Sequence, residues 1–328
     1  MKWRIAIVAA LGLGLALYLV CHVGVGLVLS AATHVGWRGF AALCVYALST
    51  QPILAAGWRT LLPPGCEASY GVLLWARMIR EAASDVLPFS QLGGIVLGAR
   101  AAIVHRTAPS LAFASIIADV TAELLAQVAF IALGLAILLT HLPHTPFAAS
   151  LGRYFLLGLA LAISAGAVLL ALQRYGHRLT FRLAARLLPR SVAHAAAVAD
   201  ALDAIYAEPA RVALSCAIHL GAWIASAVGT LIAFRLMGAH VDFLTVIAVE
   251  SFVSGVRSIA VLVPNGLGIQ EATYTVLAPL LGVGAPLGLA VSLLKRARDI
   301  ALGVPVLLIS QAAEGRRVLG RGDLTDPQ

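Results

Sequence analysis

Long apolar runs alternate with short polar stretches along nearly the whole chain. A helix needs about 20 mostly apolar residues to cross the hydrocarbon core of a bilayer. Five stretches reach this length with few or no charges, and they cover residues 5–31, 40–61, 111–139, 154–172 and 212–234. A sixth, 280–309, is long enough but carries Lys295, Arg296, Arg298 and Asp299 near its middle. The pattern predicts an all-α polytopic membrane protein with about six full transmembrane helices.

Two further segments, 70–106 and 242–271, hold too many charges for lipid-facing spans and contain helix breakers. The breakers are Pro88 with Gly93 and Gly94, and Pro264 with Asn265, Gly266 and Gly268. A break in a helix leaves backbone N–H and C=O groups without partners. At bilayer depth such groups persist only where they face buried protein or a polar cavity. The segments are therefore expected to be broken or re-entrant helices. Such a pair in corresponding positions of two halves points to a transport site.

The two breaks also suggest an internal repeat. Three predicted crossings, an odd number, lie between Pro88 and Pro264, so the two segments enter from opposite faces of the membrane. This is the geometry of an inverted repeat. We expect a single integral membrane domain over residues 1–315, with halves at about 1–140 and 150–315, and a cytoplasmic tail over 316–328.

Composition agrees with this assignment, since 61% of the residues are hydrophobic and only 12% are charged. The formal net charge is +8, and its basic residues cluster between spans, so the positive-inside rule explains it without a nucleic acid partner. The basic segments near the N-terminus, over 173–211 and near the C-terminus predict a cytoplasmic location for both termini. Segment 140–152 has no Lys or Arg and is expected outside.

Ionisable residues within a membrane domain are costly and are functional candidates by default. Several occur at helical spacing, such as Asp119 with Glu123, four residues apart. Arginine forms forked bonds to phosphate or carboxylate, so Arg77, Arg80, Arg257 and Arg298 are candidates to meet an anionic head group. The carboxylates would balance charge and admit protons.

An alternative is internal charge pairing, which fixes helix packing without touching any substrate. The glycine turns could add backbone N–H groups to an anion site, or could serve tight helix packing instead. The complete set of candidate substrate-binding residues is Arg77, Arg80, Glu81, Asp85, Pro88, Gly93, Gly94, Arg100, Asp119, Glu123, Glu250, Arg257, Pro264, Asn265, Gly266, Gly268, Glu271, Arg298 and Asp299.

The sequence carries no signature of a hydrolase, an ATPase or a transferase. It contains no Walker-type loop, no His-Glu-x-x-His and no Cys-x-x-Cys. The cysteines and histidines lack metal-ligand spacing, and the histidines, His219 among them, are expected mostly at membrane interfaces. We therefore predict no enzymatic activity, no cofactor and no metal.

The segment from Pro264 to Glu271 reads Pro-Asn-Gly-Leu-Gly-Ile-Gln-Glu. It resembles the Pro-x-Gly-x-Gly-x-x-Glu motif of the flippase-like transmembrane domain of the lysylphosphatidylglycerol synthase family. The stretch from Leu293 to Pro305 is similar to that family's arginine-bearing last span. Asn265 departs from the glycine of many relatives, although Asn tolerates left-handed conformations. Residues 85–100 resemble a hopanoid-associated branch of the family.

The resemblance implies movement of a polar lipid head group between leaflets of the bacterial inner membrane, with membrane lipids, hopanoid derivatives among them, as partners. The soluble aminoacyltransferase domain of the better-known members does not follow in this sequence. A second hypothesis is a membrane-embedded enzyme of lipid head-group assembly, and a third is a scaffold for lipid-synthesis enzymes. The lipid inventory of a deletion strain separates the first two, because only loss of an enzyme removes a covalent product.

Overall fold

The computed structural model describes residues 25–86, 90–141, 189–259 and 268–322, with isolated positions between 153 and 167. Over these ranges the fold is all-helical and contains no strand. The helices are α2 (Val25–Leu61), α3 (Tyr70–Val86), α4 (Ser90–Val104), α5 (Pro109–His141), α7 (Pro189–Tyr206), α8 (Pro209–Leu236), α9 (Phe243–Ile259), α10 (Ile269–Leu277) and α11 (Ala285–Gly322). A short 3-10 helix, η2 (Ala278–Leu281), joins α10 to the segment before α11.

Within the described ranges, three helices are long and apolar enough to cross a membrane. They are Val35–Leu61 within α2, Pro109–Thr140 within α5 and Pro209–Leu236, which is α8. Their mean hydropathies of 1.4, 2.2 and 1.7 come with lengths of 27, 32 and 28 residues, above the roughly 20 that a bilayer requires. They coincide with three of the predicted spans. The chain is therefore a helical membrane protein, and a total of six crossings stays a prediction.

The remaining predicted spans differ in how much of them is described. Residues 154–172 and most of 5–31 lie outside the described part of the chain. The sixth span, 280–309, corresponds to η2 and α11, and α11 continues through its four central charges as one helix to Gly322. Lys295 and Arg296 pair with carboxylates of other helices, and Arg298 and Asp299 line a cavity, as described below. Such surroundings allow a helix of this composition to cross a bilayer.

Each predicted broken segment forms a pair of helices. Residues 70–106 fold as α3 and α4, which pack closely on each other, and residues 242–271 contain α9 and the start of α10, which also touch. Pro88, Pro264, Asn265 and Gly266 lie outside the described residues. Gly268 has φ of 77°, a left-handed conformation that suits glycine, and immediately precedes α10.

Gly93 and Gly94 were expected in a turn but lie inside α4, which begins at Ser90. A Cβ atom at Gly94 would come within 2.6 Å of the Arg80 carbonyl oxygen, so this glycine lets α4 approach the backbone of α3. The tight-packing explanation of this glycine pair therefore fits Gly94.

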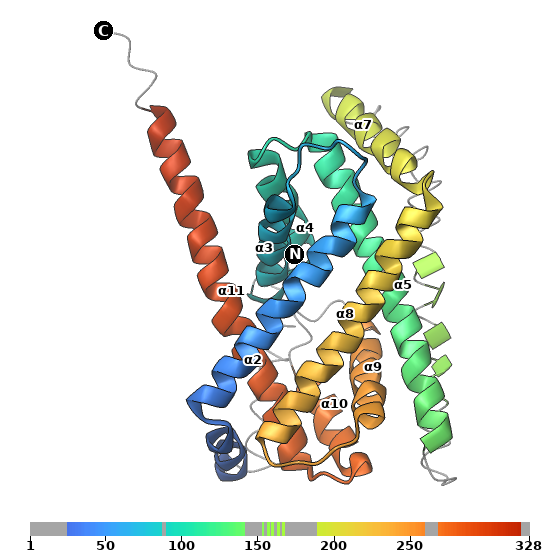
Figure 1. The fold of residues 1–328 in the computed structure, drawn as a ribbon, viewed down its shortest axis with the longest axis vertical. Helices are drawn as coiled ribbons and strands as arrows, with labels where there is room; N and C mark the ends of the chain where they lie inside the picture. Colours follow the sequence, from blue (N-terminus) through green and yellow to red (C-terminus); the bar gives the residue numbers. More distant parts are fainter. Residues whose placement is uncertain are drawn as a thin grey trace.

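A pair of short helices lies at each end of the molecule, and long helices connect the two ends (Figure 1). Helices α2 and α8 pack against each other and run in opposite directions. The α3–α4 pair lies at the end to which α2 rises, and α9 with α10 lies at the end to which α8 descends. Helix α5 packs along α9, while α11 packs along α3. The long helix of each chain half thus supports the short helices of the other half.

Buried apolar residues form one core at each end. One surrounds Phe234, Val246 and Leu289, and the other surrounds Trp58 and Ile116. Large apolar side chains are also exposed on the long helices, among them Val45, Leu133, Leu214 and Leu308. Exposed apolar surface on membrane-spanning helices is the face that contacts lipid tails, because hydrocarbon replaces water there.

Two long helices are irregular. Helix α2 has a kink at Gly36, where φ is 59° and ψ is 177°. It also contains Pro52, and α11 contains Pro305. A proline within a helix removes one main-chain hydrogen bond, to the carbonyl four residues earlier. The cavity described below lies beside both prolines.

Candidate functional site

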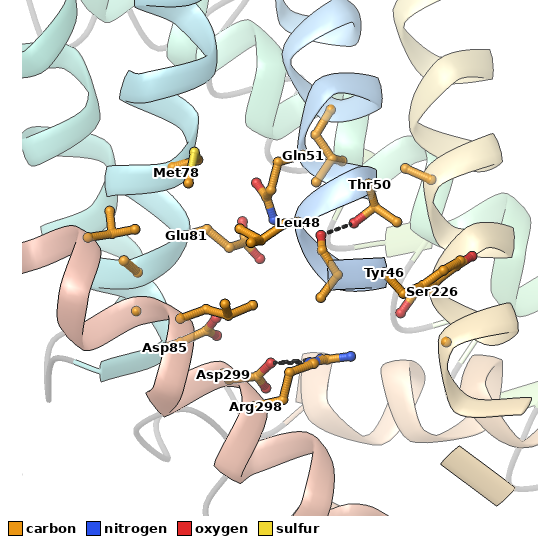
Figure 2. Close-up of a pocket in the computed structure, with 18 of the residues that line it drawn as sticks. Tyr46, Leu48, Thr50, Gln51, Met78, Glu81, Asp85, Ser226, Arg298 and Asp299 are labelled. Carbon is orange, nitrogen blue, oxygen red and sulfur yellow. Dashed lines mark hydrogen bonds and ion pairs between the residues drawn. The ribbon is translucent and has the colours of Figure 1, made fainter. Parts of the chain in front are cut away.

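A cavity of about 180 Å³ lies among α2, α3, α8 and α11, with one residue contributed by α5. Its charged or titratable lining residues are Glu81, Asp85, Glu123, His219, Arg298 and Asp299. Figure 2 shows Glu81 and Asp85 of α3 facing the space from one side and Arg298 and Asp299 of α11 from another. Uncharged polar residues of α2 and α8 also line it, namely Tyr46, Thr50, Gln51 and Ser226, and the rest of the lining is mostly apolar.

The wall behind Glu81 contains a buried ion network centred on Arg77, whose side chain is fully buried. Its Nη1 donates to Oδ2 of Asp119 at 2.9 Å, and its Nη2 donates to Oε1 of Glu123 at 2.9 Å. A third bond, of 3.2 Å, joins Nη2 to Oε2 of Glu81. Three carboxylates therefore surround one guanidinium, which is the arrangement that makes a buried charge tolerable.

Arg80 extends the same network one helical turn further along α3. Its Nη1 donates to Oδ2 of Asp119 at 2.6 Å, and its Nη2 donates to Glu123. Asp119 also receives a hydrogen bond of 2.9 Å from Nε2 of His219, which joins α8 to the network. His219 is fully buried beside the cavity, where it gives the buried Asp119 a third partner.

The opposite wall of the cavity carries a pair of neighbours on α11. Arg298 donates from Nε and Nη2 to Oδ1 of Asp299, at 3.0 and 2.7 Å. Asp85, near the end of α3, lies within electrostatic range of Arg298 and Asp299, and also of Arg257 near the end of α9. Ends of short helices from both halves of the chain therefore meet beside this wall.

A second buried ion pair joins α11 to α9. Lys295 of α11 bonds to both oxygens of Glu250 of α9, at 2.7 and 2.8 Å, and to the hydroxyl groups of Thr230 and Tyr274. The Tyr274 hydroxyl also donates to Glu250. Four helices are thereby joined at one buried point.

A third group fixes α10 against α11. Nε of Arg296 donates to Oε1 of Glu271 at 2.6 Å, and Glu271 is fully buried in the first turn of α10. Gln270 donates to the Ser292 hydroxyl at 3.1 Å and accepts from Nη1 of Arg257 at 3.2 Å. These bonds hold the start of α10 in place. A carboxylate there is also favoured by the positive end of the helix dipole.

One family model matches the chain, and it describes the transmembrane region of lysylphosphatidylglycerol synthase. The match covers residues 3–306, which include every residue lining the cavity. The chain belongs to this family. Membership implies a membrane function related to lipids. No curated protein and no solved structure gives a significant match to the chain.

Within this family member, the sequence-predicted ionisable residues named here fall into four groups. Glu81, Asp85, Glu123, Arg298 and Asp299 line the cavity. Arg77, Arg80 and Asp119 lie behind its wall, while Glu250 and Glu271 form the separate ion pairs of the second half. Arg100 is exposed on α4. The alternative of internal pairing thus describes the contacts of Arg77, Arg80 and Asp119.

Sequence reasoning missed the polar residues that α2 and α8 contribute to the cavity. Tyr46, Thr50, Gln51 and Ser226 are scattered through apolar spans, where single polar residues are common. Lys295 and Arg296 were noted in the sequence but not included among the site residues. The signal available for them was their position beside Arg298 in an otherwise apolar stretch. Among the described residues, no cluster of three or more metal-ligating side chains occurs.

Proposed function

We propose that this chain is a transporter of the bacterial inner membrane that moves amphipathic lipids from one leaflet to the other. The observation that carries the proposal is a cavity with charged lining residues that lies among helices whose outer surfaces are apolar. A polar head group cannot cross hydrocarbon alone, because transfer of an unpaired polar or charged group costs several kcal/mol. A cavity of this kind offers it partners while its acyl tails stay in lipid.

We propose in addition that the chain contains an internal inverted repeat, and such repeats place transport sites between two related halves. In this arrangement α2, α3, α4 and α5 correspond to α8, α9, α10 and α11. Helices α2 and α8 run in opposite directions in Figure 1, as do α5 and α11. The packing of α5 on α9 corresponds to the packing of α11 on α3, and α4 on α5 corresponds to α10 on α11.

Residue positions agree with the same correspondence. Helices α3 and α9 both contain 17 residues, and the eighth residue is Arg77 in one and Glu250 in the other. Their partners, Asp119 and Lys295, are each the eleventh residue of α5 and α11. The two ion pairs are therefore equivalent in position and opposite in sign. When the acidic and the basic residue exchange positions, the ion pair is kept. Two halves of a repeat can therefore diverge in this way without leaving a buried charge unpaired.

The orientation that we propose places both termini in the cytoplasm. Arg59, Arg106 and Arg211 are at the ends of helices that meet at one end of the bundle, and Arg211 donates to the Leu62 carbonyl at 2.9 Å. At the other end, segment 237–249 contains no Lys or Arg, and the basic residue beside it, Arg235, donates to the Val241 carbonyl at 3.3 Å. An excess of basic residues on one side marks the cytoplasmic face.

The proposal is tested with purified protein in liposomes that contain lipids labelled on one tail. The panel should include hopanoid derivatives, in view of the branch that residues 85–100 resemble. We expect label to reach the opposite leaflet faster than in empty vesicles. Ser226→Trp, which fills the cavity by replacing a residue that takes part in none of the ion pairs described above, should bring exchange down to the empty-vesicle rate. Leu214→Trp, on the exposed face of the same helix, is the matched control and should retain exchange.

No exchange of any lipid above empty vesicles would overturn the proposal. Equal activity in both tryptophan variants would show that the cavity is not the route. Analysis of the lipids recovered from the vesicles separates transport from chemistry, because an enzyme would leave a covalently altered lipid. We propose that the recovered lipids are unchanged.

A further inference from the structure

His219 of α8 is a fully buried side chain in the lining of the cavity. Its Nε2 donates to Oδ1 of Asp119 at 2.9 Å. Its other ring nitrogen, Nδ1, has no hydrogen-bond partner among the residues that the structure describes. A buried polar atom of this kind beside a cavity indicates that the contents of the cavity supply its partner.

The contacts of Asp119 fix which ring nitrogen can take up a proton. Its Oδ2 accepts from Arg77 and from Arg80, at 2.9 and 2.6 Å, while its Oδ1 accepts from His219. A carboxylate that accepts from three donors is ionised and donates nothing, so the bond to His219 requires a proton on Nε2. In the neutral imidazole, Nδ1 therefore carries the lone pair to which a further proton binds.

The neighbouring helix holds the ring in this orientation. A Cβ atom at Gly57 of α2 would lie 3.0 Å from Nε2 of His219 and 3.3 Å from Cδ2 and Cε1, so α2 packs directly against the ring. The Ser215 hydroxyl, one turn earlier on α8, donates to the Gly57 carbonyl at 3.0 Å. The cavity of about 180 Å³ has room for several water molecules, which can carry protons to Nδ1.

A network of five charged side chains on α3 and α5 lies next to His219. Its members are Arg77, Arg80, Glu81, Asp119 and Glu123. Two positive charges meet three negative ones, which leaves one negative charge while the imidazole is neutral. A proton on His219 balances that charge, and a buried charge without a partner is costly.

The other helices around the ring leave this balance unchanged. On α11, Arg298 and Asp299 pair with each other. Asp85 of α3 lies close to like charges on Glu81 and Asp299, but also to the guanidinium groups of Arg257 and Arg298. The lining residues of α2, and those of α8 apart from the histidine itself, are uncharged. These surroundings are one proton short of neutrality.

From this arrangement we infer that His219 is a proton-binding site of the cavity. The new N–H bond forms at Nδ1 with a proton from water in the cavity, and Nε2 keeps its bond to Asp119. Glu81 and Glu123 are less suited to take up this proton, because each already accepts from an arginine.

The consequence for lipid movement rests on the proposed transport function and deepens it. A head group crosses while the cavity is closed to water, and an unbalanced buried charge is most costly in that state. Protonation of His219 removes the imbalance, so each transport step takes up a proton before closure and releases it afterwards.

The proton site is tested first, without lipid exchange. Nitrogen-15 NMR of histidine-labelled protein in liposomes distinguishes a protonated ring nitrogen from an unprotonated one, and comparison with His219→Gln assigns the signals. Between about pH 8 and about pH 5 we expect Nδ1 to gain a proton while Nε2 stays protonated. An Nδ1 that keeps one protonation state over this range overturns the inference. His219→Asn serves for the assignment if His219→Gln does not fold.

Leaflet exchange then tests whether the proton serves transport. Tail-labelled phosphatidylglycerol and monoglucosyl diacylglycerol are suitable probes, since neither head group titrates near neutral pH. We expect wild-type exchange to be several-fold faster at about pH 6 than at about pH 8. His219→Gln keeps an amide N–H for Asp119 but binds no proton, so its exchange should be slow and independent of pH. His240→Gln, at an exposed position, is the matched control and should follow the wild type.

The outcomes separate this inference from the transport proposal. Exchange with the same pH dependence in the wild type and in His219→Gln overturns the inference and leaves transport standing. A pH dependence that is lost in Asp85→Asn and kept in His219→Gln assigns the proton to Asp85, which also overturns the inference. Proton uptake at Nδ1 without exchange of any lipid supports the proton site and rejects transport.

Discussion

Arg77 shows how a buried charge is stabilised in this protein. Its guanidinium meets carboxylates of Glu81, Asp119 and Glu123, of which two belong to α5 and lie 42 and 46 residues away in the chain. Removing one partner of such a group leaves the others buried and uncompensated, which costs more than the net contribution of the intact pair. The network therefore makes α3 and α5 depend on each other.

We expect Arg77→Met to lower the free energy of unfolding by about 3–5 kcal/mol, because Asp119 and Glu123 would retain only Arg80 as their arginine partner. Unfolding of the detergent-solubilised protein, followed by far-ultraviolet circular dichroism, measures the change. Arg38→Met, at an exposed position of α2, is the control and should stay within about 0.5 kcal/mol of the wild type. Equal losses in the two variants would show that the network contributes nothing special to stability.

Residue types and spacing could identify the acidic and basic candidates, but not their partners. Arg77 and Glu81 are four apart on one helix and their contact is readable from the sequence. His219 is 100 residues from Asp119, and Lys295 is 45 residues from Glu250. Those contacts depend on how helices cross, and crossing geometry is set by packing over whole surfaces rather than by local pattern.

At the scale of elements, α3 and α4 form the most closely packed pair near the cavity. Gly94 and Gly98 face α3, and a Cβ atom at Gly98 would lie 2.9 Å from Ile116 and 3.1 Å from the Arg80 Cβ. Small residues at such places let helix backbones approach closely in membranes. The packing fixes the position of Arg80 and, through it, one wall of the site.

Gly93 and Gly94 offer adjacent substitutions with opposite expectations. Gly94→Ala would bring a Cβ atom within 2.4 Å of the Ser84 hydroxyl and 2.6 Å of the Arg80 carbonyl oxygen, and overpacking of this kind costs about 1–3 kcal/mol. Gly93→Ala meets no atom within 4 Å and should be neutral or stabilise α4 by up to about 1 kcal/mol. Thermal unfolding of both variants decides the point. A larger loss for Gly93→Ala would contradict the packing of α4 on α3.

The sequence pattern located the helix pairs well, since both broken segments contain two helices, but it misplaced the glycines of the first. A proline and nearby glycines indicate a break without saying which of them marks it. Glycine is required at position 94 because α3 packs against it, and the sequence does not show which helix packs there. The spans 40–61, 111–139 and 212–234 were predictable because a long apolar run has few other stable structures.

At the scale of the whole molecule, the long helices α2 and α8 connect two ends of the bundle that differ in charge. The loop after α2 contains Cys66, and the turn after α8 contains His240, at the opposite end of α8 from Arg211. The proposed orientation makes the first cytoplasmic and the second external. This assignment is tested by labelling single cysteines of the intact protein in its membrane.

We expect a membrane-impermeant maleimide to label His240→Cys in intact spheroplasts, in a background where the four native cysteines are replaced. The exposed position and external location give the reagent direct access. A variant that retains Cys66 alone should react only after the membrane is permeabilised. The reverse pattern would invert the orientation and, with it, the direction from which a lipid reaches the cavity.

Pro52 and Pro305 weaken the resistance to bending of α2 and α11, two of the helices that line the cavity. Each interrupts the main-chain hydrogen bonds of its helix close to lining residues, Gln51 in α2 and Val306 in α11. Bending at these points requires no further bond to break, because the bonds to the carbonyls of Leu48 and Ala301 are already missing. We therefore expect α2 and α11 to bend most easily at these prolines, which would widen the cavity toward one side of the membrane.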